Sequence, residues 1–236
     1  MTHSTELIAK AYHEAGHQVV AFLVSEVMET EYVTINPIIS KSADPKSGGG
    51  VQVHIKKAIS ILTLNEIDEL VLVNFAGFCA ENFQKHNGVI GDEFYKSNTW
   101  APDISSLKYK GDVERIGSYL KRILPEIKMN QVEYFSSCIE FVYKLFMKQP
   151  VWEAVVQIKV ALLKESSHTL NNEKVARIIS NTSLPLWKDK NIIAIKEKRN
   201  KLLYSKVQIL KLQMTMIFIL IVIVIAIFIT VVTLNK

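Results

Sequence analysis

The sequence is poor in cysteine, and its N-terminal end lacks an apolar stretch. Only two of the 236 residues are cysteines, Cys79 and Cys138, and both lie within apolar helical patterns. Two such residues do not make the disulfide framework of a small secreted protein, so we expect a reducing compartment. Residues 1–10, MTHSTELIAK, have none of the apolar core of a secretory signal peptide.

The chain also lacks a strong net charge over most of its length. Its formal charge is +5, but residues 187–211 alone carry eight basic and two acidic side chains, a net +6. Because Lys236 adds one further positive charge, residues 1–186 carry a net −2. Nucleic-acid binding depends on clustered positive charge, which this main segment does not have, so we exclude nucleic acid as a partner.

The sequence does contain a long uncharged apolar run near its C-terminal end. Residues 214–232 carry no charge, and only Thr215 and Thr230 are polar. At about 1.5 Å per residue, a helix of this length spans roughly the 30 Å of a bilayer core. We therefore predict a transmembrane helix over 212–234. The basic residues before it predict, by the positive-inside rule, a single-pass protein with a C-terminal anchor and a cytosolic main domain.

The rest of the chain predicts a mainly α fold with a small β-sheet, an α+β class. Ser4 can cap a first helix, and two strands at 31–38 and 51–55 follow it as a pair. The later helices are predicted at 64–85, 111–124 (ended by Pro125), 130–148, 151–165 and 172–180. We divide the chain into a domain at 1–186, a basic juxtamembrane linker or helix at 187–211 and the membrane helix at 212–234.

Residues 11–23, AYHEAGHQVVAFL, set two histidines and a glutamate in an otherwise apolar helical pattern. His13 and His17 are four residues apart, so a helix presents both imidazoles on one face, one turn apart. Two such nitrogens can each approach one Zn²⁺ at about 2.0–2.1 Å. Glu14 emerges beside the pair, where it can take a proton from a metal-activated water without binding the metal. This HExxH spacing is typical of the zincins and predicts a zinc-dependent hydrolase.

A catalytic zinc ion takes three protein ligands, so the two histidines need a third partner. The metzincin pattern requires glycine at 20 and histidine at 23, and the valine and leucine found there exclude that class. The remaining candidates are acidic, and the residues alone leave them open: Glu81, Asp92, Glu93, Asp103 and Asp112.

Four short motifs occur in a characteristic order: AYHEAGHQVV, VTINP, AGFCAENF and GDVERI. This order resembles the peptidase domain of the FtsH-type membrane proteases, zinc enzymes with a histidine-glutamate helix, a VTI-x-P strand and an AGxxAE helix. The resemblance covers residues 5–182 and extends to the helical end of that domain at 151–179. It implies an FtsH-peptidase-like helical domain.

The resemblance also implies roles for individual residues. The zinc ligands in this family are two histidines and an aspartate at the start of a helix, which correspond to His13, His17 and Asp112. Glu14 corresponds to the general base. Glu81 corresponds to a family glutamate near the site, where a carboxylate can orient a metal ligand.

Three departures from the family pattern qualify this resemblance. The threonine- and glycine-rich run before the aspartate is replaced by NTWAPDISSLKYKGD, which keeps Asp103 as a rival third ligand. No P-loop is present, because SGGGVQV lacks the lysine and the hydroxyl residue of that motif. The membrane segment lies at the C-terminal rather than the N-terminal end. We therefore expect a separate ATPase partner or a homo-oligomer.

The second predicted strand is the candidate for substrate binding. In zincins an exposed strand beside the metal pairs with the extended backbone of the substrate. GGVQVHI offers such an edge, and we assign Val51, Gln52 and Val53 to it. His54 would face the cleft under this hypothesis, but a lone histidine in a strand is more often structural.

Together these features predict a membrane-anchored zinc metalloendopeptidase that cleaves unfolded or flexible protein segments. Its cofactor is Zn²⁺, and its partners are a protein or peptide substrate and the lipid bilayer. The alternative is a non-catalytic, zinc-binding regulatory or scaffolding relative. Glu14 argues against that alternative, because a purely structural zinc site has no use for a general base.

Overall fold

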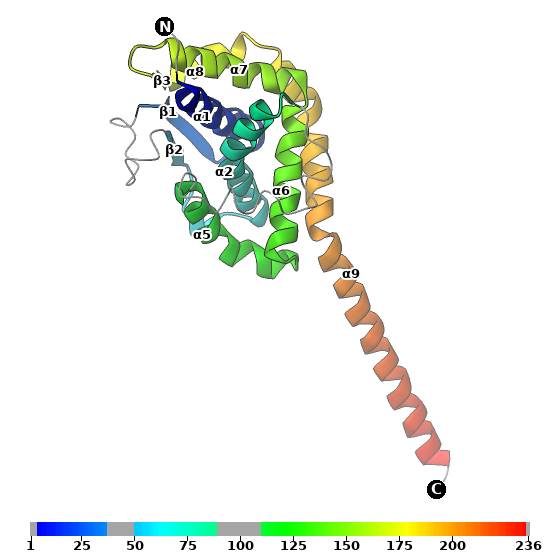
Figure 1. Cartoon of the computed structure of the whole chain (residues 1–236). Helices are drawn as coiled ribbons and strands as arrows, with labels where there is room; N and C mark the ends of the chain where they lie inside the picture. The colour runs from blue at the N-terminus through cyan, green and yellow to red at the C-terminus, as the bar shows by residue number, and fades with distance from the viewer. Residues whose placement is uncertain (1–3, 37–49, 89–109, 235–236) are drawn as a thin grey trace.

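The computed structural model describes residues 4–36, 50–88 and 110–234, with the backbone alone for 52, 53, 110, 206–214 and 222–234. The fold is mainly helical with a small antiparallel sheet, as predicted (Figure 1). In chain order its elements are α1 (Thr5–Val24), β1 (Met28–Thr34), β2 (Gly50–Ile55), the short 3-10 helix η1 (Ile59–Ile61), α2 (Leu64–Lys85), α5 (Lys110–Ile127), α6 (Gln131–Phe146), α7 (Gln149–Lys164), β3 (Thr169–Asn171), α8 (Asn172–Ser180) and α9 (Leu184–Leu234).

Helices α1 and α2 form the centre of the domain, with the sheet on one side and α6 and α9 on the other (Figure 1). The Ser4 side chain accepts a hydrogen bond from Leu7 N and starts α1, and a Thr63–Glu66 capping box starts α2. The two helices approach closely at Gly16, where an added Cβ would lie 2.6 Å from the carbonyl oxygen of Ala76. Glycine is therefore needed at this crossing.

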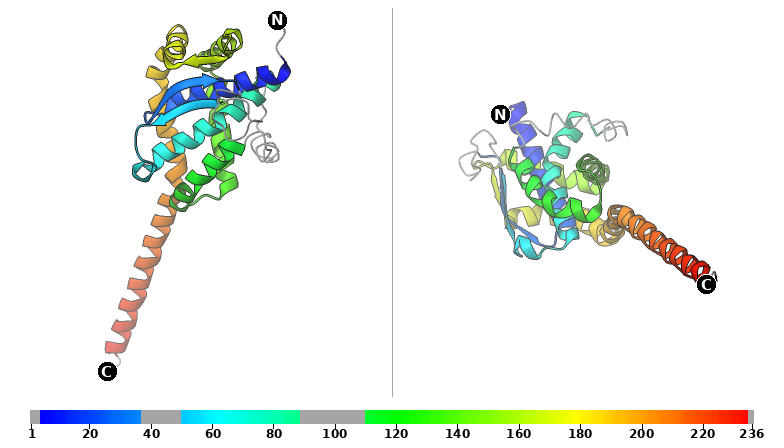
Figure 2. Two further views of the ribbon diagram at one scale, coloured as in Figure 1. Left: turned by 90° about the vertical axis from the view of Figure 1, so that its left-hand side faces the viewer. Right: turned by 90° about the horizontal axis from the view of Figure 1, so that it is seen from below.

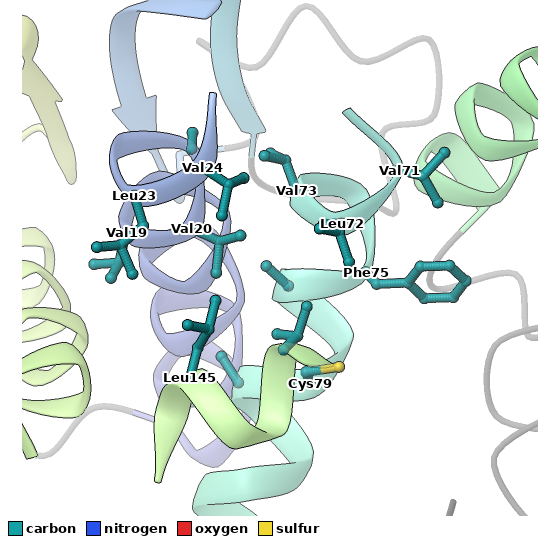
Figure 3. Close-up of a cluster of buried hydrophobic side chains, with 14 of the residues drawn as sticks. Val19, Val20, Leu23, Val24, Val71, Leu72, Val73, Phe75, Cys79 and Leu145 are labelled. Atoms are coloured by element: carbon teal, nitrogen blue, oxygen red, sulfur yellow. The ribbon is translucent and has the colours of Figure 1, made fainter. Parts of the chain in front are cut away.

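The core between α1 and α2 is built from branched aliphatic side chains. Figure 3 shows Val20 and Val24 of α1 on the side of α1 that faces Val73 of α2, with Leu145 of α6 below Val20. All four side chains are buried. Burying each of them contributes about 1.5–3 kcal/mol, which fixes the two helices against each other.

The sheet has the strand order β2-β1-β3, and every pair is antiparallel. β1 begins three residues earlier than predicted and runs back beside α1 toward its N-terminal end (Figure 2, left). Its pairing with β2 was expected. β3 was not predicted, because three residues carry no alternating pattern and the strand exists through its pairing with β1.

Two helix boundaries differ from the prediction because of proline. Pro125 was expected to end the helix at 124, but α5 continues to Ile127, which is fully buried. Burial of that side chain sustains one more turn despite the missing N–H group. α7 starts at Gln149 rather than at 151, with Pro150 in its first turn, where an unpaired N–H would otherwise stand.

The first part of α9 packs against the domain rather than forming a separate linker. Leu184, Ile192 and Leu203 are buried in the core, and Arg199 is only 4% exposed. Lys188 and Lys196 bind main-chain carbonyls at the end of α1. Three of the eight basic residues assigned to the juxtamembrane segment therefore make contacts inside the fold.

The second part of α9 extends away from the domain as one continuous helix (Figures 1 and 2). Its described apolar side chains, from Met216 to Ile221, are 47–67% exposed. Most of the predicted span at 212–234 lies outside the side chains that the structure describes. Among the helices that could be assessed in the described part of the chain, none is both long and apolar enough to cross a membrane.

Candidate metal centre

Two helices bring the predicted ligands together. His13 and His17 lie on one face of α1, and Asp112 lies in the first turn of α5. The Nε2 atoms of the two histidines are 2.9 Å apart. Asp112 Oδ2 is 3.1 Å from His13 Nε2 and 3.4 Å from His17 Nε2. This group of side chains could hold a metal ion.

The triangle of ligand atoms matches the size of a tetrahedral site. Ligands about 2.0–2.1 Å from one Zn²⁺ in tetrahedral geometry stand about 3.3 Å from each other. The observed separations of 2.9, 3.1 and 3.4 Å lie around that value. Movements of a few tenths of an ångström would suffice to bind an ion, so the donor set fits the predicted metal.

The outer nitrogens of both rings are engaged by the protein. His17 Nδ1 donates to the main-chain carbonyl of Val73 at 2.6 Å, since a carbonyl oxygen can only accept. His13 Nδ1 lies 2.9 Å from Glu81 Oε1, the pairing of a carboxylate with a histidine that often supports metal ligands. When each ring is neutral and carries its proton on Nδ1, both Nε2 atoms are lone-pair acceptors.

Three acceptors therefore converge on one point, and the point requires a positive charge. The two Nε2 lone pairs and the carboxylate oxygen of Asp112 would repel one another with nothing between them. Either a proton on one ring or a bound cation removes this repulsion. The geometry is compatible with a metal site.

The electrostatics of the buried groups favour a positive charge at this point. Burial alone would lower the pKa of His13, but its bonds with Asp112 and Glu81 and the charge of Glu14 raise it well above its ordinary value. Burial opposes ionisation of Asp112, yet His17 and His13 hold the pKa of its carboxyl well below the usual range. The surroundings thus stabilise positive charge on the histidine side and negative charge on the aspartate.

Glu14 is the buried carboxylate beside this triangle, only 5% exposed. Burial raises the pKa of Glu14, and the nearby charges of His13 and His17 act in the opposite direction. Arg115 also lowers the pKa of Glu14, and its Nη1 lies 3.4 Å from Asp112 Oδ1, the carboxylate oxygen turned away from the histidines. The raised pKa makes this carboxylate a better proton acceptor than an exposed glutamate.

Gly77 of α2 is part of the site, although the sequence analysis gave it no role. A Cβ at this position would lie 2.5 Å from His17 Nε2 and 2.6 Å from His13 Nε2. The bare main chain of α2 therefore makes room for both rings. The signal in the sequence was the glycine itself, because glycine inside a helix costs about 1 kcal/mol relative to alanine.

The predicted substrate strand lies beside α1. β2 is at the edge of the sheet in the described part of the chain, and Val51, which is half-buried, pairs with Val33. From Val24 back to His13 is about 16 Å of helix, and β1 covers a similar length from Met28 to Val33. The strands are therefore long enough to reach from the end of α1 back to the level of the histidines.

Other residues considered for the site lie elsewhere or beyond the described part. The backbone of Gln52 and Val53 continues β2, but their side chains are not described. His54 is exposed and pairs across the strands with Glu29. The rival ligands Asp92, Glu93 and Asp103 lie outside the described residues.

A scan against models of known protein families gives no match, and a search among curated proteins finds no similar sequence. Kinship with the FtsH-type peptidases therefore stays a prediction from the motifs.

Proposed function

We propose that this protein is a membrane-anchored zinc endopeptidase of the FtsH-peptidase type, which hydrolyses peptide bonds in unfolded or flexible protein segments. The observation that carries the proposal is the convergence of His13, His17 and Asp112 next to the buried carboxylate of Glu14. Three ligands leave a fourth position for water or substrate, the arrangement of catalytic rather than structural zinc sites.

In this proposal each residue of the site has its own role in hydrolysis. A bound Zn²⁺ acts as a Lewis acid and lowers the pKa of water toward about 7. Glu14 takes the proton from the attacking water and delivers it to the leaving amine. Glu81 and the Val73 carbonyl keep each histidine in the tautomer that binds metal through Nε2. Arg115 holds the outer oxygen of Asp112, which leaves Oδ2 for the metal.

The proposed substrate site is the edge of β2 that pairs with no other strand in the described part of the chain. An extended peptide that pairs with this edge at Val51 would bring its carbonyl groups level with the histidines. Pairing through the main chain depends little on side-chain identity. This supports cleavage of unfolded or flexible segments rather than of one defined sequence.

The membrane anchor rests on the uncharged run at 214–232, together with the exposure of Met216 to Ile221. The excess of basic residues before that run supports a cytosolic main domain. Since the sequence has no P-loop, substrate unfolding would be left to a separate ATPase, or substrates would already be unfolded.

The test compares two variants of the full-length chain in detergent micelles. Glu14→Gln removes the base and keeps its shape, so we expect casein cleavage to fall by about 10²–10⁴-fold while one zinc per chain is retained. Glu6→Gln, on the exposed start of the same helix, should keep both activity and zinc. Bound zinc with no cleavage by the wild type would favour the non-catalytic alternative. Absence of bound zinc would refute the metal site.

A further inference from the structure

We infer that Lys196 of α9 is a positioning residue for the metal centre, an inference that rests on the metal-binding part of the proposed function. It joins the ends of α1 and α2 and thereby fixes their spacing at the histidines. Lys196 Nζ lies 3.0 Å from the Val24 carbonyl oxygen of α1 and 2.5 Å from Glu69 Oε1 of α2. Lys196 thus contacts both helices that carry the site.

The contacts of Lys196 belong to the same helix faces as the metal site. On α1, Val24 follows His17 by seven residues, which is two helical turns. On α2, residues 69, 73, 77 and 81 recur every four positions and line one face. That face carries, in order, the partner of Lys196, the carbonyl that holds His17, the glycine under both rings and the carboxylate at His13.

The side chains between Lys196 and His17 are closely packed. Val20, Val24 and Val73 pack directly between the two helices and are at most 4% exposed (Figure 3). Close-packed side chains transmit a displacement rather than absorb it. A change in spacing at Val24 and Glu69 therefore reaches the hydrogen bond between His17 Nδ1 and the Val73 carbonyl, one turn further along α2.

Lys188 provides a matched control on the same helix. Its Nζ binds the Phe22 carbonyl oxygen at 2.6 Å, so it caps α1 in the same way as Lys196. The described contacts of Lys188 include no residue of α2. A general effect of losing one lysine cap should therefore follow from either substitution, whereas an effect of joining the helices should follow from Lys196 alone.

The experiment compares Lys196→Met, Lys196→Arg and Lys188→Met in the full-length chain in detergent micelles. Two quantities are measured: the NMR resonance of the His17 Nδ1–H group without metal, and the affinity for Co²⁺ as a probe of the site. We expect Lys196→Met to shift or broaden the resonance and to weaken Co²⁺ binding by about tenfold. Lys196→Arg should restore both, and Lys188→Met should change neither.

Two outcomes would overturn the inference: an unchanged His17 resonance in Lys196→Met, or equal changes in Lys196→Met and Lys188→Met. If Lys196→Met does not fold, Glu69→Gln takes its place, because it weakens the contact to α2 and leaves the bond to Val24. A wild type that binds no Co²⁺ refutes the metal site. The metal-free resonance then still decides whether Lys196 positions His17.

Discussion

Two buried polar clusters share helix α2, and they differ in whether their hydrogen bonds and charges balance. Near its start, Asp68 accepts from Arg199 Nε at 2.7 Å, from Arg199 Nη2 at 2.8 Å and from Tyr134 OH at 2.8 Å. The remaining donor Nη1 binds the Ser137 carbonyl at 3.0 Å. One positive charge faces one negative charge, and both side chains are almost fully buried.

At the metal centre the negative and positive charges are not matched one to one. Three acidic groups, Asp112, Glu14 and Glu81, surround the two histidines. The positive charge described beside them comes from Arg115 and from an imidazole ring when it is protonated. A saturated cluster such as Asp68–Arg199 is complete as structure. A cluster with more carboxylates than permanently charged cations favours one further positive charge, either a proton on a ring or a bound cation. The contrast separates a structural polar group from a candidate functional one without any reference to sequence relatives.

The largest effect on stability should come from breaking the buried ion pair between Asp68 and Arg199. Asp68→Asn leaves the Arg199 guanidinium buried without its counter-charge, and we expect the free energy of unfolding to fall by about 3–5 kcal/mol. Chemical denaturation of the full-length chain measures this loss. The double variant Asp68→Leu with Arg199→Met should recover most of the stability, because no charge is then buried. A stable single variant would show that the pair contributes little.

A smaller effect should come from filling the space under the metal centre. Gly77→Ala puts a methyl group within 2.6 Å of both Nε2 atoms, so the rings must turn away. Overpacking costs about 1–3 kcal/mol, and we expect that cost as a loss of roughly a hundredfold in zinc affinity. Gly117→Ala in α5 is the control, since its added Cβ meets nothing within 4 Å. Equal zinc affinity in both variants would contradict the close approach of α2.

The smallest effect should come from removing one outer charge. Glu81→Gln keeps an oxygen that can accept from His13 Nδ1, but it loses the charge that makes the imidazole a better ligand. We expect zinc affinity to fall by about tenfold with unchanged stability, measured by competition with a chelator. Glu140→Gln, whose carboxylate pairs with Lys144 of α6, should leave the affinity unchanged. An affinity equal to that of the wild type would remove Glu81 from the site.

Parts of the fold with local signals were predictable from the sequence. α2 and α8 span the predicted residues, and in the structure the side chains of Thr63 and Asn171 cap their starts. β3 and the last turn of α5 depend on distant partners, so local patterns missed them. In α9 the sequence gives the sign of the charge on Arg199 but not its burial, and only the tertiary structure assigns it to Asp68.

The candidate site shows the same division. His13, Glu14 and His17 were predicted from spacing alone, because four residues make one helical turn. Asp112 was one of several acidic candidates until the family resemblance favoured it, since ninety-five residues separate it from His17. The Val73 carbonyl left no trace in the sequence, because every residue supplies the same main-chain group.

That carbonyl has a consequence for how the protein can vary. Glu81 can be exchanged by a single codon change, so the support of His13 is open to adjustment during evolution or in the laboratory. The partner of His17 is the main-chain carbonyl of residue 73. No substitution of the side chain at that position removes this carbonyl oxygen. Substitution can therefore change the hydrogen-bond partner of His13, whereas the partner of His17 persists as long as helix α2 is folded.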